Sequence, residues 1–231
     1  PWQRFLILIT GDSSESLFFP LYNLMALPTS PTAAQLEAVN ELLMSVGQAP
    51  VTQLEATNPD VALAFETLTQ VSREVQAQGW TFNKEYNLKT FVPDAVTKKI
   101  AIPDDVIQID LSDSSANAAF DAVRRSGFLY DRQNHTYEWS STPEVDVVYF
   151  FDWGDLPRPI RDYIVAKGAV IFSSRIVGDT SQYQLLFQRE QSAQANAMEY
   201  ECNQGDYTFF GHPDSGNYYR GYQPFNALHR R

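Results

Sequence analysis

The sequence has little cysteine and little histidine, and this excludes several kinds of functional site. It contains one cysteine, Cys202, and three histidines in 231 residues. A single cysteine cannot form a disulfide framework within one chain, and it is consistent with assembly in a reducing cytoplasm. Three scattered histidines and one cysteine do not supply the ligands of a metal site. We therefore expect no metal site, and we interpret Cys202 as a small residue of the core.

Sequence motifs of catalysis and cofactor binding are also missing. The chain has no P-loop, GxSxG, HExxH, CxxC pair or GxGxxG that opens a helix. Gly11-Asp12-Ser13-Ser14 faintly resembles the nucleophile block of GDS-type esterases, which also need a downstream Asp-x-x-His to activate the serine. No Asp lies three residues before His135, His212 or His229. We interpret the block as a turn, and we expect no catalytic residue and no cofactor.

An alternative interpretation gives a catalytic role to several carboxylates. Asp104 and Asp105, with Asp110 or Asp113, could supply the two acidic groups that cleave a glycosidic bond. Acidic residues this close in sequence are usually solvated loop residues, so the pattern has little specificity. A glycan or peptidoglycan hydrolase activity stands as the alternative to a protein without catalysis.

The sequence is short of basic residues. Seventeen Lys and Arg against 28 Asp and Glu give a net charge of −11. A protein that grips a phosphate backbone needs clustered cations that release counterions. The acidic balance suits a surface that nucleic acid passes without sticking, although such a balance often reflects only solubility.

Long hydrophobic runs are absent too. The apolar run at residues 5–9 is far shorter than the roughly 20 residues that cross a bilayer. A secretory signal is not indicated, because its basic region would consist of Arg4 alone. Met25 lies directly before a Pro/Thr/Ser linker, so we expect Met25 to be the natural start and residues 1–31 to be an extension and linker.

Two helices are predicted near the N-terminus. Thr32 and Gln35 have the form of a capping box, and the apolar spacing that follows predicts a helix over residues 32–46 that ends at Gly47. Asn58 can cap a second helix, over residues 58–78, in which Pro59 occupies the first position. Gly79 supplies a left-handed stop, after which Trp80 is placed to pack back onto Val75.

The period of the hydrophobic pattern changes to two over residues 80–151. This predicts a mostly antiparallel sheet, in which the segment 144–151 is the most strand-like. The polar residues 131–135 are predicted to form the loop of a hairpin. The predicted strands are the alternating segment 80–88 and the segments 106–111, 128–130, 136–139 and 144–151.

Two more helices are predicted after the strands. The segment 156–177 is apolar nearly all round, so it should be the most buried helix. The segment 181–202 is rich in Gln and Ala, and its apolar face is weak for its length. A helix of this kind needs neighbours, which another subunit can supply. The expected apolar face consists of Tyr183, Leu186, Phe187, Ala193, Ala197 and Tyr200.

The predicted fold class is therefore α+β. A bundle of two N-terminal and two C-terminal helices carries a small, mostly antiparallel sheet inserted between them, and an extended C-terminal arm follows. We expect three regions: the extension 1–31, a main domain over 32–202, and the arm 203–231.

The arm has no helical or strand period but is rich in aromatic residues among Gly, Pro, Asn and Asp. Aromatic residues and Arg serve as anchors in protein interfaces. We expect an arm that orders on a partner, with a segment wrapped on its own domain as the alternative. The expected docking residues are Tyr207, Phe209, Phe210, Tyr218, Tyr219, Arg220, Tyr222 and Phe225.

From residue 33 onward the chain resembles tail tubular protein A, the adaptor family of short-tailed phages. The stretches that carry the resemblance are AAQLEAVNELLMSVGQAPVTQLE (33–55), VSREVQAQGWTFN (71–83), GFLYDR (127–132), LPRPIRDYIVAKGAVIFSSRIVG (156–178) and AMEYECNQGDY (197–207). Their order and spacing cover about 200 residues. Residues 1–24 have no counterpart in the family pattern, which agrees with a start at Met25.

The resemblance implies a dodecameric ring between the portal protein and a tail nozzle resembling tail tubular protein B. It further implies attachment of tail fibres, passage of viral DNA without specific binding, and a place in the virion after assembly in the host cytoplasm. The docking arm would then bind the portal. The alternative becomes an adaptor-like tail protein that also hydrolyses glycan or peptidoglycan.

Overall fold

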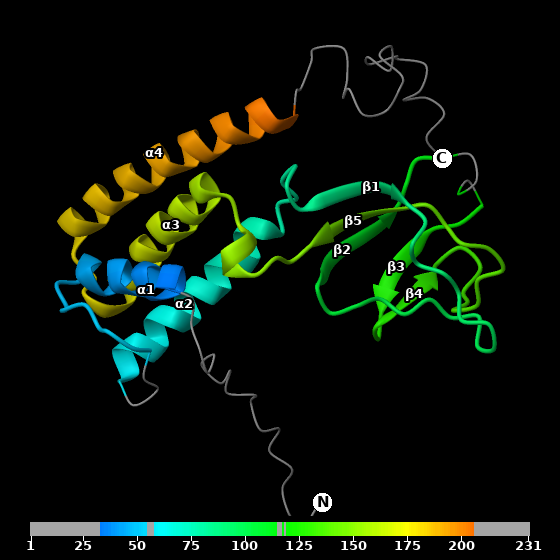
Figure 1. Ribbon diagram of the computed structural model, residues 1–231, viewed down its shortest axis with the longest axis horizontal. Helices are drawn as coiled ribbons and strands as arrows, with labels where there is room; N and C mark the ends of the chain where they lie inside the picture. The colour runs from blue at the N-terminus through cyan, green and yellow to red at the C-terminus, as the bar shows by residue number, and fades with distance from the viewer. Residues whose placement is uncertain (1–32, 55–57, 115–116, 118, 206–231) are drawn as a thin grey trace, which may run out of the picture.

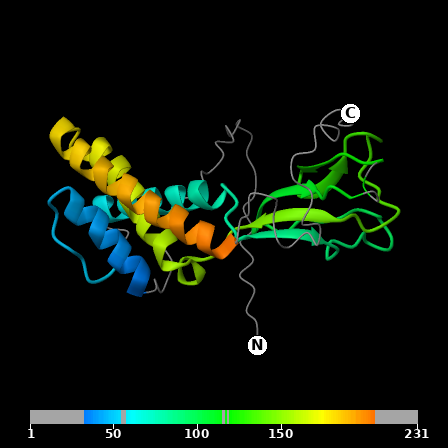
Figure 2. The ribbon, with the colours of Figure 1, turned by 90° about the horizontal axis from the view of Figure 1, so that it is seen from above.

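The computed structural model describes residues 33–54, 58–114, 117 and 119–205. These residues form an α+β fold in which the helices gather at one end and the strands at the other, as Figures 1 and 2 show. The fold class predicted from the sequence is confirmed. The helices are α1 (Ala33–Ser45), α2 (Pro59–Gln76), the short 3-10 helix η2 (Trp153–Asp155), α3 (Arg158–Ile176) and α4 (Thr180–Gly205). The strands are β1 (Lys84–Leu88), β2 (Val106–Leu111), β3 (Ala122–Arg125), β4 (Phe128–Asp131) and β5 (Val145–Tyr149).

The ends of α1 and α2 follow the predicted signals. Asn58 caps α2, because its side chain accepts a hydrogen bond from the backbone N–H of Asp60 at 3.1 Å. Gly47 and Gly79 both adopt the left-handed conformation, with φ of 77° and 74°. Trp80 folds back as expected, and its indole Nε1 donates to the Val75 carbonyl at 2.7 Å. The predicted cap of α1, Thr32, lies outside the described residues.

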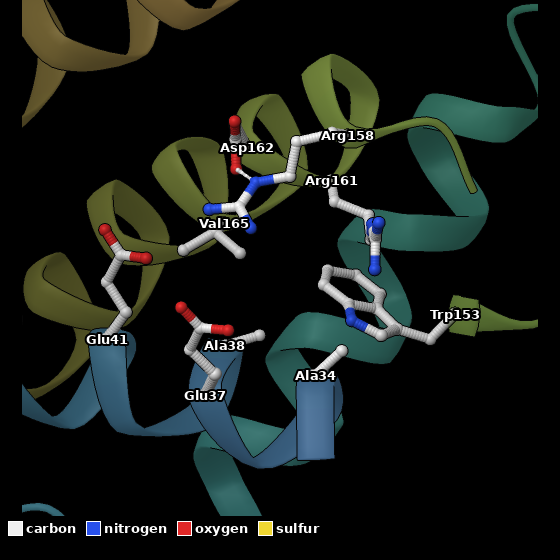
Figure 3. Close-up of a pocket in the computed structure, with 9 residues that line it drawn as sticks. All are labelled: Ala34, Glu37, Ala38, Glu41, Trp153, Arg158, Arg161, Asp162 and Val165. Carbon is white, nitrogen blue, oxygen red and sulfur yellow. Dashed lines mark hydrogen bonds and ion pairs between the residues drawn. The ribbon is translucent and has the colours of Figure 1, made fainter. Parts of the chain in front are cut away.

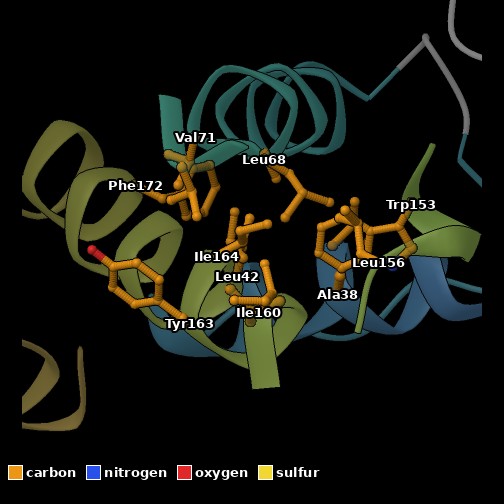
Figure 4. Packing of buried hydrophobic residues seen from close by; sticks show 14 of the residues in the cluster. Ala38, Leu42, Leu68, Val71, Trp153, Leu156, Ile160, Tyr163, Ile164 and Phe172 are labelled. Atoms are coloured by element: carbon orange, nitrogen blue, oxygen red, sulfur yellow. The ribbon is translucent and has the colours of Figure 1, made fainter. Parts of the chain in front are cut away.

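The helical end has its own core, formed mainly by α1, α2 and α3 (Figure 4). As predicted, α3 is deeply buried, because apolar side chains occur on nearly all of its faces. The largest fully buried side chain of the described residues is Phe172, which lies among Leu42, Leu68 and Ile164 in this cluster. A second, separate core lies under the strands and includes Leu129, Val147 and Trp139.

The strands form two small sheets. β5 is the centre of an antiparallel sheet with the order β1-β5-β2, and β3 pairs with β4 in a two-stranded hairpin. The segment 144–151 was predicted to be the most strand-like, and residues 145–149 of it form this central strand. Val145 and Val147 face the core under the strands, and Val148 is buried on the opposite face, so apolar residues are needed on both faces of β5.

The structure corrects two predictions about the strands. The predicted alternation over residues 80–88 is wrong in its first half, because residues 80–83 form a turn in which the Trp80 N–H bonds the Asn83 side chain at 2.9 Å. The hairpin predicted around residues 131–135 is also wrong. The segment 128–131 pairs instead with β3, and only one isolated bridge joins Asp131 to Thr136.

A buried polar network joins the helical end to the larger sheet. The Gln76 side chain accepts from the Phe151 N–H at 2.8 Å and donates to the Phe151 carbonyl at 3.1 Å. The Asn83 side chain donates to the carbonyls of Gln76 and Tyr149, both at 2.9 Å. Buried amides that are bonded in this way fix the positions of their partners, so α2, the turn after it and the end of β5 form one junction.

Candidate assembly surface

α4 is the longest helix of the described residues and lies along α3 at one side of the molecule (Figures 1 and 2). Gly178 separates the two helices with φ of 67°. The Asp179 carboxylate then accepts from the Gln182 N–H at 3.0 Å, in the manner of a helix cap. Twenty-six residues at 1.5 Å each make α4 about 39 Å long, so it runs along much of the helical end.

Polar contacts hold the first half of α4 to the body. The Gln182 side chain donates to the Ser45 carbonyl at the end of α1, and Arg189 pairs with Glu41. Glu190 lies close enough to Lys167 of α3 for their charges to interact. Burial raises the pKa of the Glu190 carboxyl, and this effect outweighs the attraction of Lys167.

Glu201 holds the second half of α4. This residue is 8% exposed. Its carboxylate accepts from the Thr81 backbone N–H at 2.9 and 3.0 Å and from the Thr81 hydroxyl at 2.6 Å. Thr81 belongs to the turn that follows α2, so Glu201 attaches α4 to the junction between helices and sheet.

Few side chains of α4 are buried, as the weak apolar pattern predicted. The buried positions are Ala197, Glu201 and Gly205, which recur every four residues on the side that faces the body. Of the expected apolar face, Ala197 is buried, Tyr183 and Phe187 are exposed, and the other three are half-buried. Two corrections follow from the same helix. It continues three residues past the predicted end at 202, and Cys202 is exposed because it lies one residue away from the buried side.

Three of the exposed apolar side chains of α4 lie on a flank beside its buried side. Tyr183, Phe187 and Met198 are 42%, 39% and 49% exposed. The first two rings stack at 5.9 Å between centroids, and Met198 follows Phe187 by about three helical turns. We call these three residues the α4 flank. Leu185, which is 69% exposed, lies on the opposite side of the helix.

A small cavity lies between α1, η2 and α3 (Figure 3). Its volume is about 30 Å³, which is room for a few atoms. Trp153 and Arg161 lie on one wall, and Glu37 and Glu41 of α1 lie opposite. This cavity could not be predicted from the sequence, because its residues come from distant segments without a shared motif.

The residues predicted from the sequence to carry function fall in different places. The docking residues Tyr207–Phe225 and the block at residues 11–14 lie outside the described residues. Asp104 is exposed and pairs with Arg124 at 3.3 Å. Asp105 and Asp110 line different hollows of the surface, so the structure does not bring them together as a catalytic pair would require. Within the described residues, no group of three or more His, Cys, Asp or Glu side chains could hold a metal ion.

The family model of the tail tubular proteins matches residues 36–207. The chain belongs to this family. The match includes every described helix and strand, apart from the first three residues of α1. No match was found among curated proteins.

Membership of the tail tubular protein family gives the chain a structural role in a phage tail and a place in the virion. It also confirms the resemblance seen in the sequence at the level of the family. Along the described part of the chain, no helix is both long and apolar enough to cross a membrane.

Proposed function

We propose that this tail tubular protein is the adaptor of a short phage tail, and that its copies form a ring, a dodecamer, between the portal protein and the tail nozzle. The α4 flank is the observation that carries the proposal. Contiguous exposed apolar surface marks interaction sites, and the stacked rings of Tyr183 and Phe187 give such a surface on the side of α4 that also carries Met198. A contact between this flank and a different surface of the next copy is heterologous, and such contacts close into rings by rotation.

The remaining parts of the chain take roles around this ring. The arm, shortened from the predicted 203–231 to 206–231 because α4 extends to Gly205, binds the portal through its aromatic residues and Arg220. The nozzle and the tail fibres bind other surfaces, and viral DNA passes through the ring without specific binding, in keeping with the net charge of −11. Assembly takes place in the host cytoplasm, and the protein has no catalytic activity.

Substitutions on the α4 flank test the proposed subunit contact. Phe187→Glu and Met198→Glu are expected to leave the fold intact, because both side chains are exposed, and to prevent ring formation. Burial of a large apolar side chain contributes about 1.5–3 kcal/mol, and the loss would recur at every contact of the ring. The measurement is electron microscopy and light scattering of the purified protein mixed with its portal protein.

Leu185→Glu is the matched control. It makes the same change in charge on the same helix but on the opposite side, so rings are expected to form. Rings that form normally with both flank variants would refute the proposal, and so would an equal loss in the control.

The exposed thiol of Cys202 gives an independent measurement. It lies one turn beyond Met198 on the same helix. A maleimide reagent is expected to label Cys202 quickly in the free subunit and slowly in the assembled ring. Equal labelling rates in both states would show that this part of α4 stays uncovered.

Two further experiments address the arm and the absence of catalysis. Deletion of residues 206–231 is expected to leave the body folded and to abolish binding to the portal protein in a pull-down.

A reducing-sugar assay with glycan or peptidoglycan is expected to show no turnover. Turnover that disappears on Asp104→Asn or Asp105→Asn would refute the non-enzymatic role.

A further inference from the structure

The cavity between α1, η2 and α3 contains two buried N–H donors without acceptors. Trp153 is 7% exposed. Within the described part of the chain, neither its indole Nε1 nor the Nε of Arg161 has a hydrogen-bond partner. A buried donor without a partner costs about 1–3 kcal/mol, so native proteins rarely leave one.

The other tryptophans of the described residues show what is missing. The indole N–H of Trp80 donates to the Val75 carbonyl at 2.7 Å, and that of Trp139 donates to the Leu129 carbonyl at 3.1 Å. Both acceptors are neutral carbonyls of the main chain. Trp153 therefore differs from them in its missing acceptor, although it is buried in the same way.

The charges around the cavity favour a neutral acceptor. Arg158 pairs with Asp162 at 2.8 Å, and Glu41 pairs with Arg189. One carboxylate, from Glu37, and one guanidinium are then left on the walls, and their charges cancel. A carboxylate or phosphate ligand would gain little from such a site, whereas a carbonyl oxygen accepts from both donors without bringing a charge.

The segment directly before α1 can supply such a carbonyl, because it joins α1 beside the cavity. Ala34, in the first turn of α1, lines the cavity (Figure 3). Residues 17–36 contain no charged side chain, and residues 28–31 read Pro-Thr-Ser-Pro. Segments with this spacing favour the polyproline II conformation, which leaves its carbonyls free, and aromatic-lined grooves bind such segments. Five residues reach about 17 Å, enough to cross the cavity from the start of α1.

We propose that residues 28–32 of the same chain dock over this cavity, with a main-chain carbonyl accepting from Trp153 Nε1 and from Arg161. This contact attaches the segment before α1 to the start of α3.

Nitrogen-15 NMR of the tryptophan indoles tests the proposal. Deletion of residues 1–27 keeps the proposed segment, and deletion of residues 1–32 removes it. Both variants lack Trp2, so three indole signals remain, and Trp153→Phe identifies the one from Trp153. The longer deletion is expected to shift the Trp153 signal and to speed its hydrogen exchange about tenfold, which corresponds to roughly 1.4 kcal/mol. The shorter deletion is expected to change neither.

The signals of Trp80 and Trp139 are internal controls, because their acceptors belong to the described core. They are expected to stay in place in both variants, which shows that the fold is kept. An unchanged Trp153 signal after the longer deletion would overturn the proposal, since a bound water or another group would then be the acceptor. Exchange that depends on protein concentration in the full chain would also overturn it, by assigning the acceptor to a second copy.

Discussion

The attachment of α4 by Glu201 gives a prediction that can be worked out from the structure. Glu201→Ala removes the acceptor of the Thr81 N–H and of its hydroxyl group. Hydrogen bonds to a charged group contribute about 1.5–3 kcal/mol each. The bonds share one donor residue and are not additive. We therefore expect the free energy of unfolding to fall by about 2–3 kcal/mol.

The expected loss is measured by urea denaturation, with the midpoint and the slope followed separately. Hydrogen exchange of the amides in the last turns of α4 should also become faster than exchange in its first turns, which Gln182 and Arg189 still hold. Glu199→Ala is the control, because Glu199 is an exposed carboxylate on the same helix. An exposed substitution of this kind usually changes stability by less than about 0.5 kcal/mol.

A second substitution separates the contact from other effects of the alanine. Thr81→Val removes the hydroxyl that bonds Glu201, so the two variants should be coupled by about 1–2 kcal/mol in a double-mutant cycle. A loss below about 0.5 kcal/mol in Glu201→Ala, or a coupling near zero, would refute the idea that this contact fixes α4.

Three other substitutions have expected outcomes. Gly168→Ala should raise the melting temperature, because an added Cβ lies 3.5 Å from Leu42 in ordinary contact and alanine favours a helix interior by about 0.5–1 kcal/mol; a lower temperature would contradict this. Gly79→Ala should lower stability by about 1–2 kcal/mol in urea denaturation, because φ is 74° there. Burial raises the pKa of Asp131. Hydrogen bonds from the Asn134 side chain and from backbone N–H groups together lower the pKa by more than burial raises it, so the pKa lies below its usual value. The stability from this carboxylate is present above its unfolded pKa of about 3.9 and lost as pH falls through the lower folded value, a dependence that Asp131→Asn should remove.

The helices could be predicted from the sequence because their signals are local. The cap at Asn58, the proline after it and the glycine at position 79 act within one turn of the chain, and α2 begins and ends within two residues of the prediction. The strands were harder. The hairpin of β3 and β4 turns at Ser126 and Gly127, which both have positive φ. Ser-Gly is a weaker sequence signal for such a turn than Asn-Gly.

The predicted hairpin loop at residues 131–135 was wrong for a related reason. Asp131 bonds the backbone N–H groups of Gln133 and Asn134, so the chain folds back on itself. The polar residues that suggested a loop between two strands therefore form a compact turn after the last strand of the hairpin.

The candidate surface could be predicted in outline only. The shortage of apolar residues in α4 is visible in the sequence and correctly indicated a helix with much exposed surface. The role of Glu201 in holding α4 could not be predicted from the sequence, because its partner Thr81 lies 120 residues away. A polar residue four positions after the buried Ala197 was the one available signal, and it has no meaning until the buried side of the helix is known.

The same contact links the proposed ring to the orientation of the sheets. Glu201 bonds the turn after α2, and that turn holds Asn83, whose side chain bonds the end of β5. Two polar contacts thus fix α4 relative to the central strand β5. If copies meet along the α4 flank, each β part is held at a fixed angle to the ring. Glu201→Ala should then give rings in which the β parts are blurred in class averages while the helical parts stay sharp, and equal sharpness of both would contradict this coupling.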